Sequence, residues 1–232
     1  MTTPPAPDLT ADRHLRASEP IEAEAFIRTH TMLSSVPLVP ELTLHLATAI
    51  TPIWQATEDW LAARNIDPPF WAFAWPGGQA LARHILDHPA AVAGRRVLDF
   101  AAGCGIAAIA AASAGAACVE ATEIDPLALV ALRLNAAANR VAINAVRADA
   151  VGTPCRWDLI LGGDVCYEAP MAGRILPWFR QMAEKTEVWL ADPGRAYLPE
   201  TGLSAFARYG VPTTLELEDR TRREVTLYRL KS

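Results

Sequence analysis

The sequence predicts a doubly wound α/β fold: a mostly parallel, seven-strand sheet with helices on both faces. From Arg95 onward, short apolar segments alternate with alanine-rich stretches of helical length, as parallel strands and crossover helices require. The chain of 232 residues, 51% hydrophobic and 20% charged, is long and apolar enough for one domain with a substantial core. Two further segments near the C-terminus, separated by a short charged stretch, predict an antiparallel hairpin at the sheet edge.

The first 90 residues precede this pattern and are expected to form an extension of the same compact domain. Residues 1–18 are rich in Pro, Asp and Arg and have no apolar core, which is typical of a disordered lead. Residues 19–90 are predicted to include a strap beside the cofactor. Their expected elements are a helix over residues 19–32, a strand over 41–47 and helices over 52–64 and 79–88.

Residues 91–232 are predicted to form the α/β core. Its parallel strands should be the apolar runs RRVLDF (95–100), AACVEATE (116–123), NAVRA (144–148), WDLILGG (157–163) and EVWLAD (187–192). Helices are expected over residues 104–115, 126–140, 169–184 and 199–209. The hairpin should pair TTLELED (213–219) with EVTLYRL (224–230).

Composition narrows the classes of function. The net charge of −5 gives no basic footprint for nucleic acid, so RNA and DNA are disfavoured as substrates. The four cysteines form no Cys-x-x-Cys pair, which indicates neither a zinc site nor a disulfide framework and fits a cytoplasmic location. The longest uncharged run, residues 100–119, is mostly Ala and Gly, which favours a buried loop and helix over a membrane span.

A glycine-containing loop follows the first strand of the core. It reads Asp99-Phe-Ala101-Ala-Gly103-Cys-Gly105 and lies where the strand ends and a helix begins. Glycines there let the backbone approach a ligand, and a helix N-terminus offers free amides to its polar end. Glu123 ends the next strand, 24 positions after Asp99, and can accept hydrogen bonds from a ribose diol. Dinucleotide sites share such a loop, so the loop alone does not identify the ligand.

Two features favour a cationic ligand over a dinucleotide. Ala108 stands where the dinucleotide fingerprint requires a third glycine, and Asp99 would repel a pyrophosphate. S-adenosylmethionine supplies an ammonium group for Asp99 and a ribose for Glu123, so we predict that it is the cofactor. Asp149, after the third strand, is placed to accept a hydrogen bond from adenine; the alternative is that Asp149 only begins a turn.

The fourth core strand ends in Gly163 and Asp164, which should face the donor methyl because ligands of open parallel sheets bind at the carboxyl ends of the strands. Here the chain resembles the seven-strand class I protein methyltransferases, and more closely the lysine methyltransferases of the electron transfer flavoprotein beta subunit. The resemblance covers nearly all of the chain from about Pro37. The matching segments are PLVPELTLHLAT, PFWAFAWPGGQALARHILDHP, VLDFAAGCGIAAIAAASAGA, ATEIDP, WDLILGGDVCYE and ADPGR.

The resemblance implies an S-adenosylmethionine-dependent protein-lysine N-methyltransferase that acts on the electron transfer flavoprotein beta subunit. The family's Asp-x-x-Tyr/Phe signature falls on Asp164 and Tyr167, which marks them as the catalytic residues. The chain departs from the family at Ala101, where Gly is usual, at Glu123, where Asp is usual, and at Cys166, where an aromatic residue is common.

We expect catalysis to depend mainly on geometry, because a neutral amine attacks a sulfonium methyl in line and needs no metal. Exposing the lone pair of a free lysine at neutral pH costs on the order of 4 kcal/mol. Asp164 would attract the lysine and accept a hydrogen bond from its amine, while Tyr167 would wall the channel. Trp75, followed by Pro-Gly-Gly, is expected in a strap over the methionine end of the donor.

Several residues allow a second interpretation. The alternation of Trp71, Phe73 and Trp75 equally fits core packing. Two histidines of one predicted helix, residues 84 and 88, have a metal-ligand spacing, but they lack an acidic or cysteine partner, so a solvated helix face is favoured. Arg195 follows the fifth strand in an Asp-Pro-Gly-Arg sequence, where it could reach an acidic substrate surface or simply belong to a turn.

The segment Asp67-Pro-Pro-Phe70 matches a catalytic motif of amino-group methyltransferases, but it lies before the cofactor loop. In the non-permuted order that motif belongs after the fourth strand, so we interpret the match as coincidental. Two functions compete with the leading one. The first is a ribosomal-protein lysine methyltransferase, a label that some bacterial members of the family carry, and the second is a catalytically silent partner-binding protein that keeps the fold. The oligomeric state stays open.

Overall fold

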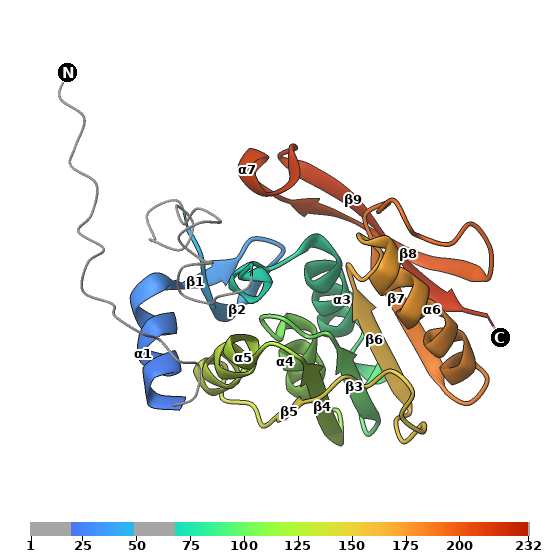
Figure 1. Ribbon diagram of the computed structural model, residues 1–232, viewed down its shortest axis with the longest axis horizontal. Helices are drawn as coiled ribbons and strands as arrows, with labels where there is room; N and C mark the ends of the chain where they lie inside the picture. The colour runs from blue at the N-terminus through green and yellow to red at the C-terminus, as the bar shows by residue number, and fades with distance from the viewer. Residues whose placement is uncertain (1–19, 49–67, 232) are drawn as a thin grey trace.

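The computed structural model describes residues 20–48 and 68–231. Its centre is a seven-stranded sheet with the strand order β5-β4-β3-β6-β7-β9-β8 (Figure 1). The strands are β3 (Arg96–Phe100), β4 (Cys118–Glu123), β5 (Asn144–Arg147), β6 (Leu159–Gly163), β7 (Glu187–Asp192), β8 (Leu203–Pro212) and β9 (Arg222–Leu230). Strands β3 to β7 are parallel, whereas β9 runs antiparallel to both of its neighbours. The predicted doubly wound fold is confirmed.

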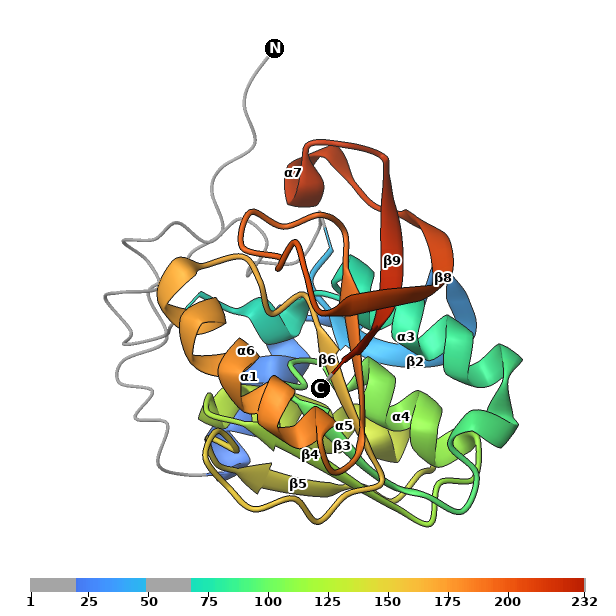
Figure 2. The same cartoon turned by 90° about the vertical axis from the view of Figure 1, so that its right-hand side faces the viewer.

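Helices cover both faces of this sheet (Figure 2). They are α3 (Pro76–Asp87), α4 (Ile106–Ser113), α5 (Pro126–Ala138) and α6 (Ala169–Ala183). Helices α3 and α4 pack on the face that presents Val97 and Leu159, while α6 packs on the opposite face, with Leu98 and Ile160. Successive strand residues point to opposite faces, so both faces of each central strand are buried. This burial explains why the strands are continuous apolar runs in the sequence.

The order in which strands are added reverses between β3 and β6. Strands β4 and β5 are added on one side of β3, and β6 and β7 on the other. The loops after β3 and β6 therefore open next to each other at the carboxyl edge of the sheet. This is the place where open α/β sheets bind their ligands.

The first described part of the N-terminal extension, residues 20–48, forms one helix and a small antiparallel sheet. Its elements are α1 (Pro20–His30), β1 (Met32–Val36) and β2 (Val39–Leu46). The helix predicted over residues 19–32 ends at His30, because Met32 already pairs with β2, and β1 was not predicted. The expected disordered lead over residues 1–18 and the helix over 52–64 lie outside the described residues.

The C-terminal hairpin differs from the prediction. The helix expected over residues 199–209 is wrong, because β8 begins there, and the predicted strand over 213–219 contains the short helix α7 (Leu215–Glu218) instead. Strand β8 pairs with β9 along nearly its whole length. Alanine and arginine in β8 favour a helix locally, but the ladder with β9 satisfies the backbone and decides the conformation.

Helix α3 buries one of its two histidines. The ring of His84 is packed against the hairpin, where its Nδ1 lies 2.9 Å from the hydroxyl oxygen of Tyr209, whereas His88 is exposed. Burial lowers the pKa of His84 to about 4. The interpretation as a solvated helix face is therefore wrong for His84. Within residues 20–48 and 68–231, no group of three His, Cys, Asp or Glu side chains could hold a metal ion.

The uncharged run over residues 100–119 forms the loop after β3, helix α4 and the start of β4, as predicted. Its alanines pack α4 closely against α3 and the sheet. No helix of the described chain has both the length and the apolar character needed to cross a membrane.

Two asparagines, Asn135 in α5 and Asn139 directly after its C-terminus, join the N-terminal extension to the core. Asn135, fully buried, accepts a hydrogen bond from the His45 N–H at 2.7 Å and donates one to the Cys104 carbonyl at 2.9 Å. Asn139 bonds both the N–H and the carbonyl of Thr43, at 3.0 and 2.7 Å. These amides satisfy backbone groups of β2 that a neighbouring strand would otherwise bond.

Replacing Asn135 with Ala should destabilise the protein by about 2–4 kcal/mol, because one buried N–H and one buried carbonyl lose their partners. Urea unfolding would measure the change. The matched control is Asn144→Ala in β5, where the side chain is exposed and the expected change is within about 0.5 kcal/mol. Equal effects of the two substitutions would contradict the bridging role of Asn135.

Candidate active site

A hollow opens at the carboxyl edge of the sheet, between the loop after β3 and the N-terminus of α3. Its lining includes Phe73, Trp75, Asp99, Ala101, Gly103 and Gly163. Five of the eight residues predicted to bind the cofactor are therefore brought together here. Gly105, Glu123 and Asp149 lie outside this lining.

Asp99 is the buried carboxyl group of this hollow. It is 4% exposed, and its Oδ2 accepts a hydrogen bond from the Ala108 N–H at 2.9 Å, in the first turn of α4. Burial raises the pKa of Asp99 to about 8; the Ala108 N–H opposes this shift and the charge of Glu123 adds to it. Such a carboxyl group ionises when a cation binds beside it, since an opposite charge lowers its pKa. The residues present therefore fit a ligand that carries an ammonium group.

The loop after β3 has a left-handed backbone at several positions. Ala101, Gly103 and Gly105 have φ values of 51°, 52° and 78°. At Gly105 a Cβ would also lie 2.8 Å from the Cγ of Leu132 on α5, so this glycine is required for packing as well as for conformation. Ala101 adopts the left-handed region at a cost of roughly 1–2 kcal/mol, because its Cβ crowds the following carbonyl oxygen.

The carboxylate of Glu123 is hydrogen-bonded to the same loop. Its Oε2 accepts a hydrogen bond from the Gly103 N–H at 3.0 Å and its Oε1 accepts one from the Ile124 N–H at 2.8 Å. The side chain is half-buried at the end of β4, and a carboxylate has lone pairs beyond these two bonds. Binding of a ribose by Glu123 stays a prediction that this geometry permits.

Asp149 makes local contacts instead of lining the hollow. Its Oδ1 accepts a hydrogen bond from the Val151 N–H at 3.0 Å, and its Oδ2 pairs with Arg174 of α6. Both contacts fit the alternative in which Asp149 begins a turn. The predicted hydrogen bond to adenine has no further support.

Helix α3 begins against the end of β6, and glycines make this close approach possible. A Cβ on Gly163 would lie 3.0 Å from the nitrogen of Gly78. A Cβ on Gly77 would lie 2.7 Å from the Ala191 carbonyl oxygen and 2.8 Å from the nitrogen of Asp164. The Pro-Gly-Gly sequence after Trp75 therefore lets the backbone of α3 contact β6 and β7 directly.

Asp164 lies at this junction with its backbone at a φ of 54°. It is 7% exposed. Its Oδ2 accepts a hydrogen bond from the Gly77 N–H, and its Oδ1 accepts two from Arg195, from Nη2 at 2.8 Å and Nε at 3.2 Å. Burial raises the pKa of Asp164 to about 6, although Arg195 and the Gly77 N–H both act to lower it. A carboxylate has about four lone-pair sites, so three protein donors leave room for one more.

Aromatic rings gather beside this carboxylate. The Phe70 ring centroid lies 5.8 Å from that of Tyr167 and 6.0 Å from that of Trp75. Trp75 is fixed because its Nε1 donates to the Phe70 carbonyl at 2.8 Å. Trp71, in contrast, is buried in a core cluster with α1 and α5. Core packing therefore explains Trp71, while Phe73 and Trp75 line the hollow.

Three residues at the site were missed or misplaced by sequence reasoning. Phe70 stands next to Tyr167 even though its motif match was interpreted as coincidental; Asp67 lies outside the described residues. Arg195 does not face an acidic substrate surface, because its guanidinium points inward to Asp164 and to Glu218 of α7. No local pattern in the sequence marked Glu218, since only the hairpin brings it here.

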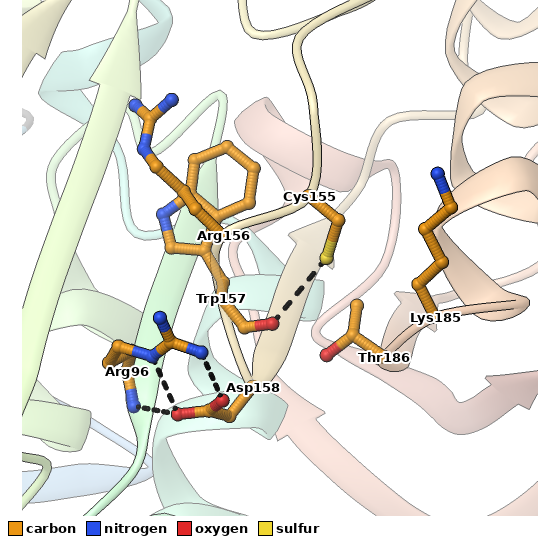
Figure 3. A pocket seen from close by; sticks show the side chains of 7 residues that line it. All are labelled: Arg96, Cys155, Arg156, Trp157, Asp158, Lys185 and Thr186. Atoms are coloured by element: carbon orange, nitrogen blue, oxygen red, sulfur yellow. Dashed lines mark hydrogen bonds and ion pairs between the residues drawn. The ribbon is translucent and has the colours of Figure 1, made fainter.

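A second hollow lies at the opposite, amino-terminal end of the sheet (Figure 3). Its two arginines are already paired: Arg96 with Asp158 at 2.7 Å and Arg156 with Glu120 at 2.5 Å. Arg156 also lies over the ring of Trp157, 4.4 Å from its centroid. The carboxyl edge, where the predicted residues converge, is therefore the candidate active site.

Comparisons with known proteins show the family of this chain. The family model described as ribosomal protein L11 methyltransferase (PrmA) matches residues 81–161. The electron transfer flavoprotein beta subunit lysine methyltransferase of Danio rerio is 37% identical over 197 residues, which cover 81% of this chain and 75% of the relative. The Xenopus laevis protein of the same name is 43% identical over 177 residues, which cover 74% of this chain and 70% of the relative. The chain belongs to this lysine methyltransferase family.

Membership in this family makes the chain an S-adenosylmethionine-dependent methyltransferase. A solved structure from Pyrococcus horikoshii, of a protein thought to be an RNA methyltransferase, superposes with a TM-score of 0.52 at 18% identity. The match covers 72% of this chain and 89% of that protein. At this identity the likeness shows the fold alone. The predicted family, fold and cofactor are thus confirmed, and the roles of the single residues remain predictions.

Ala101→Gly should stabilise the protein by about 0.5–1 kcal/mol. Glycine removes the left-handed penalty at a φ of 51°, and the greater entropy of glycine in the unfolded chain offsets part of the gain. Urea or thermal unfolding would measure the difference. Ala102→Gly serves as the control, because Ala102 is not among the residues with positive φ and the same change there should destabilise.

Binding of the donor should tighten as the pH rises from 6 towards 8. Asp99 holds its proton below its pKa of about 8, so its attraction for an ammonium appears only on ionisation, with a gain of up to about tenfold per pH unit. Calorimetry with S-adenosylmethionine across this range would measure it. Asp99→Asn keeps the shape and removes the charge, so it should flatten the dependence; identical pH profiles for the two proteins would refute the role of Asp99.

Proposed function

We propose that this methyltransferase modifies lysine side chains of the electron transfer flavoprotein beta subunit. The observation that carries the proposal is the Asp164 carboxylate, which ends β6 beside the donor hollow with one hydrogen-bonding site left over. The names of the Danio rerio and Xenopus laevis relatives support the choice of substrate. When bound, S-adenosylmethionine supplies an electrophilic methyl group.

Asp164 is proposed to accept a hydrogen bond from the substrate amine. Above the pKa of about 6 the side chain is a carboxylate, so it can accept this bond at physiological pH. The Gly77 N–H and Arg195 hold the carboxylate in one orientation, which fixes the direction of the amine lone pair. Orientation of this kind contributes much of the rate of a direct transfer between two bound groups.

Phe70, Trp75 and Tyr167 are proposed to wall the lysine channel. The ring centroid of Phe70 lies 5.8 Å from that of Tyr167 and 6.0 Å from that of Trp75. Phe70 and Tyr167 are partly exposed, so a lysine side chain could reach them from the surface. An aromatic wall packs on the apolar stem of a lysine and excludes water from its amine. A dry channel disfavours the ammonium form, which lowers the cost of exposing the lone pair.

The test is incubation of the purified enzyme with S-adenosylmethionine and the electron transfer flavoprotein beta subunit, followed by peptide mass spectrometry. We expect lysine peptides to gain one or more methyl groups. Tyr167→Ala should lower kcat/KM by up to about tenfold through loss of the aromatic contact, whereas Tyr167→Phe keeps the ring and should stay near the wild type. Absence of methylated lysines in this partner would refute the proposed substrate.

A ribosomal protein is the second candidate substrate. The match of residues 81–161 to the ribosomal protein L11 methyltransferase model favours it, although this segment contains the donor loop rather than the Asp164 to Tyr167 region. Competition between the flavoprotein subunit and L11 at equal concentrations would decide between them. Preferential methylation of L11 would make the ribosomal protein the substrate.

A further inference from the structure

A line of buried ion pairs runs from the active site into the C-terminal hairpin. Arg195 bonds Asp164, with Nη2 2.8 Å from Oδ1, and also bonds Glu218 through Nη1, 3.1 Å from Oε2. Glu218 in turn accepts a hydrogen bond from the Nε of Arg223 at 2.9 Å. The side chains of Asp164, Arg195 and Glu218 are 8%, 18% and 1% exposed. Two carboxylates and two guanidinium groups thus balance in charge.

The guanidinium of Arg195 donates hydrogen bonds to two carboxylates at once. Nε and Nη2 converge on one oxygen of Asp164, while Nη1 and Nη2 meet both oxygens of Glu218. Arginine can do this because its donors lie in one plane and point in fixed directions; an ammonium is a point charge without this fork. The backbone of Arg195 is fixed as well, since its N–H donates to Oδ1 of Asp192 at 2.6 Å.

The C-terminal hairpin places Glu218 beside Arg195. Strand β9 is antiparallel to β7, with Asp192 opposite Thr226, so β9 starts where β7 ends. The connection between β8 and β9, which contains α7, therefore lies beyond the carboxyl edge of the sheet (Figure 1). The antiparallel hairpin appended to the parallel core thus supplies a charge to the active site.

Asp164 needs a counter-charge because it is buried. A carboxyl group in such a position tends to keep its proton, since burial disfavours the charged form. The titratable groups that face it are Asp192 at the end of β7, Cys166 and Tyr167 after β6, and Arg195, which is itself bonded to Glu218. Of these titratable groups, only Arg195 is a cation, and it favours ionisation together with the hydrogen bond from the Gly77 N–H.

We propose that Arg195 is a positioning residue for Asp164: it holds this side chain as a carboxylate aimed at the substrate amine, and Glu218 of the hairpin holds Arg195. The inference rests on the proposed role of Asp164. It also explains how a carboxylate can receive a lysine that must lose its proton. An unpaired buried carboxylate would stabilise the ammonium, whereas the Asp164–Arg195 pair has no net charge and leaves the amine free to be neutral.

The test compares Arg195→Met with Arg195→Lys, and the double variant Arg195→Met/Glu218→Gln with Glu218→Gln alone. The double variant avoids leaving Glu218 with an excess of negative charge, so we expect it to tolerate the loss of Arg195 better than the single Met variant. Glu187→Gln is the matched control, because Glu187 also binds two arginines, Arg95 and Arg229, but at the amino end of β7. Circular dichroism and thermal melting would verify folding.

Two quantities should be measured in each protein: the titration of the Asp164 carboxyl carbon by 13C NMR, assigned by its loss in Asp164→Asn, and the acidic limb of kcat/KM against pH. In Arg195→Met and in the double variant both should move up by about one pH unit or more, because the cation that favours the carboxylate is gone. Arg195→Lys should shift less. Glu218→Gln leaves one acceptor oxygen for Arg195, so both quantities should shift upward by less than in the double variant. Glu187→Gln should show no upward shift.

A folded double variant in which Asp164 titrates as in the wild type would overturn the proposal. A purely structural role for Arg195 would lower the melting temperature and leave both titrations in place, and this result would overturn it too. If the wild-type enzyme methylated no lysine, the proposed function would fail, while the NMR titration would still decide whether Arg195 controls Asp164. The two failures are therefore distinguishable.

Discussion

The candidate active site is built around a buried carboxyl group directly after a central strand. Asp164 joins four parts of the molecule: its backbone ends β6, its Oδ2 meets the first turn of α3, and its Oδ1 meets Arg195, which comes from the turn after β7 and is bonded to the hairpin. A buried carboxylate is tolerated only when donors surround it. The Gly77 N–H, the inward direction of Arg195 and the position of α7 together meet this requirement.

The two buried carboxyl groups of the candidate site differ in how far burial raises their pKa values. On the proposed donor side, Asp99 is buried with one backbone hydrogen bond, and burial raises its pKa to about 8, so a cation bound beside it would favour its ionisation. On the acceptor side, Asp164 is surrounded by three donors and ionises at a lower pH. The difference lies in the neighbours: Asp99 has a peptide N–H and a nearby carboxylate, while Asp164 has an arginine. One sheet edge thereby holds two buried carboxyl groups whose pKa values differ, about 8 for Asp99 and about 6 for Asp164.

The sequence predicted much of the fold because its core strands carry a local signature. Strands such as β3 and β6 are buried on both faces, so they appear as continuous apolar runs, and Gly and Pro residues mark their ends. The hairpin lacks this signature. β8 is half-exposed and contains residues that favour a helix, so only its pairing with β9 makes it a strand. The same limit applies to β1, whose pairing with β2 is the main reason that it is extended.

For the site, the family, the candidate donor loop and the acids at the strand ends could be predicted from the sequence. Asp99, Glu123 and Asp164 occupy fixed positions relative to strands that can be recognised locally. Which residues contact one another at the site depends on the tertiary structure. It turned Asp149 towards Arg174, brought Phe70 beside Tyr167, and placed Glu218 behind Arg195. Such contacts join residues far apart in the chain, and their formation depends on how whole elements pack, which no local pattern of residues specifies.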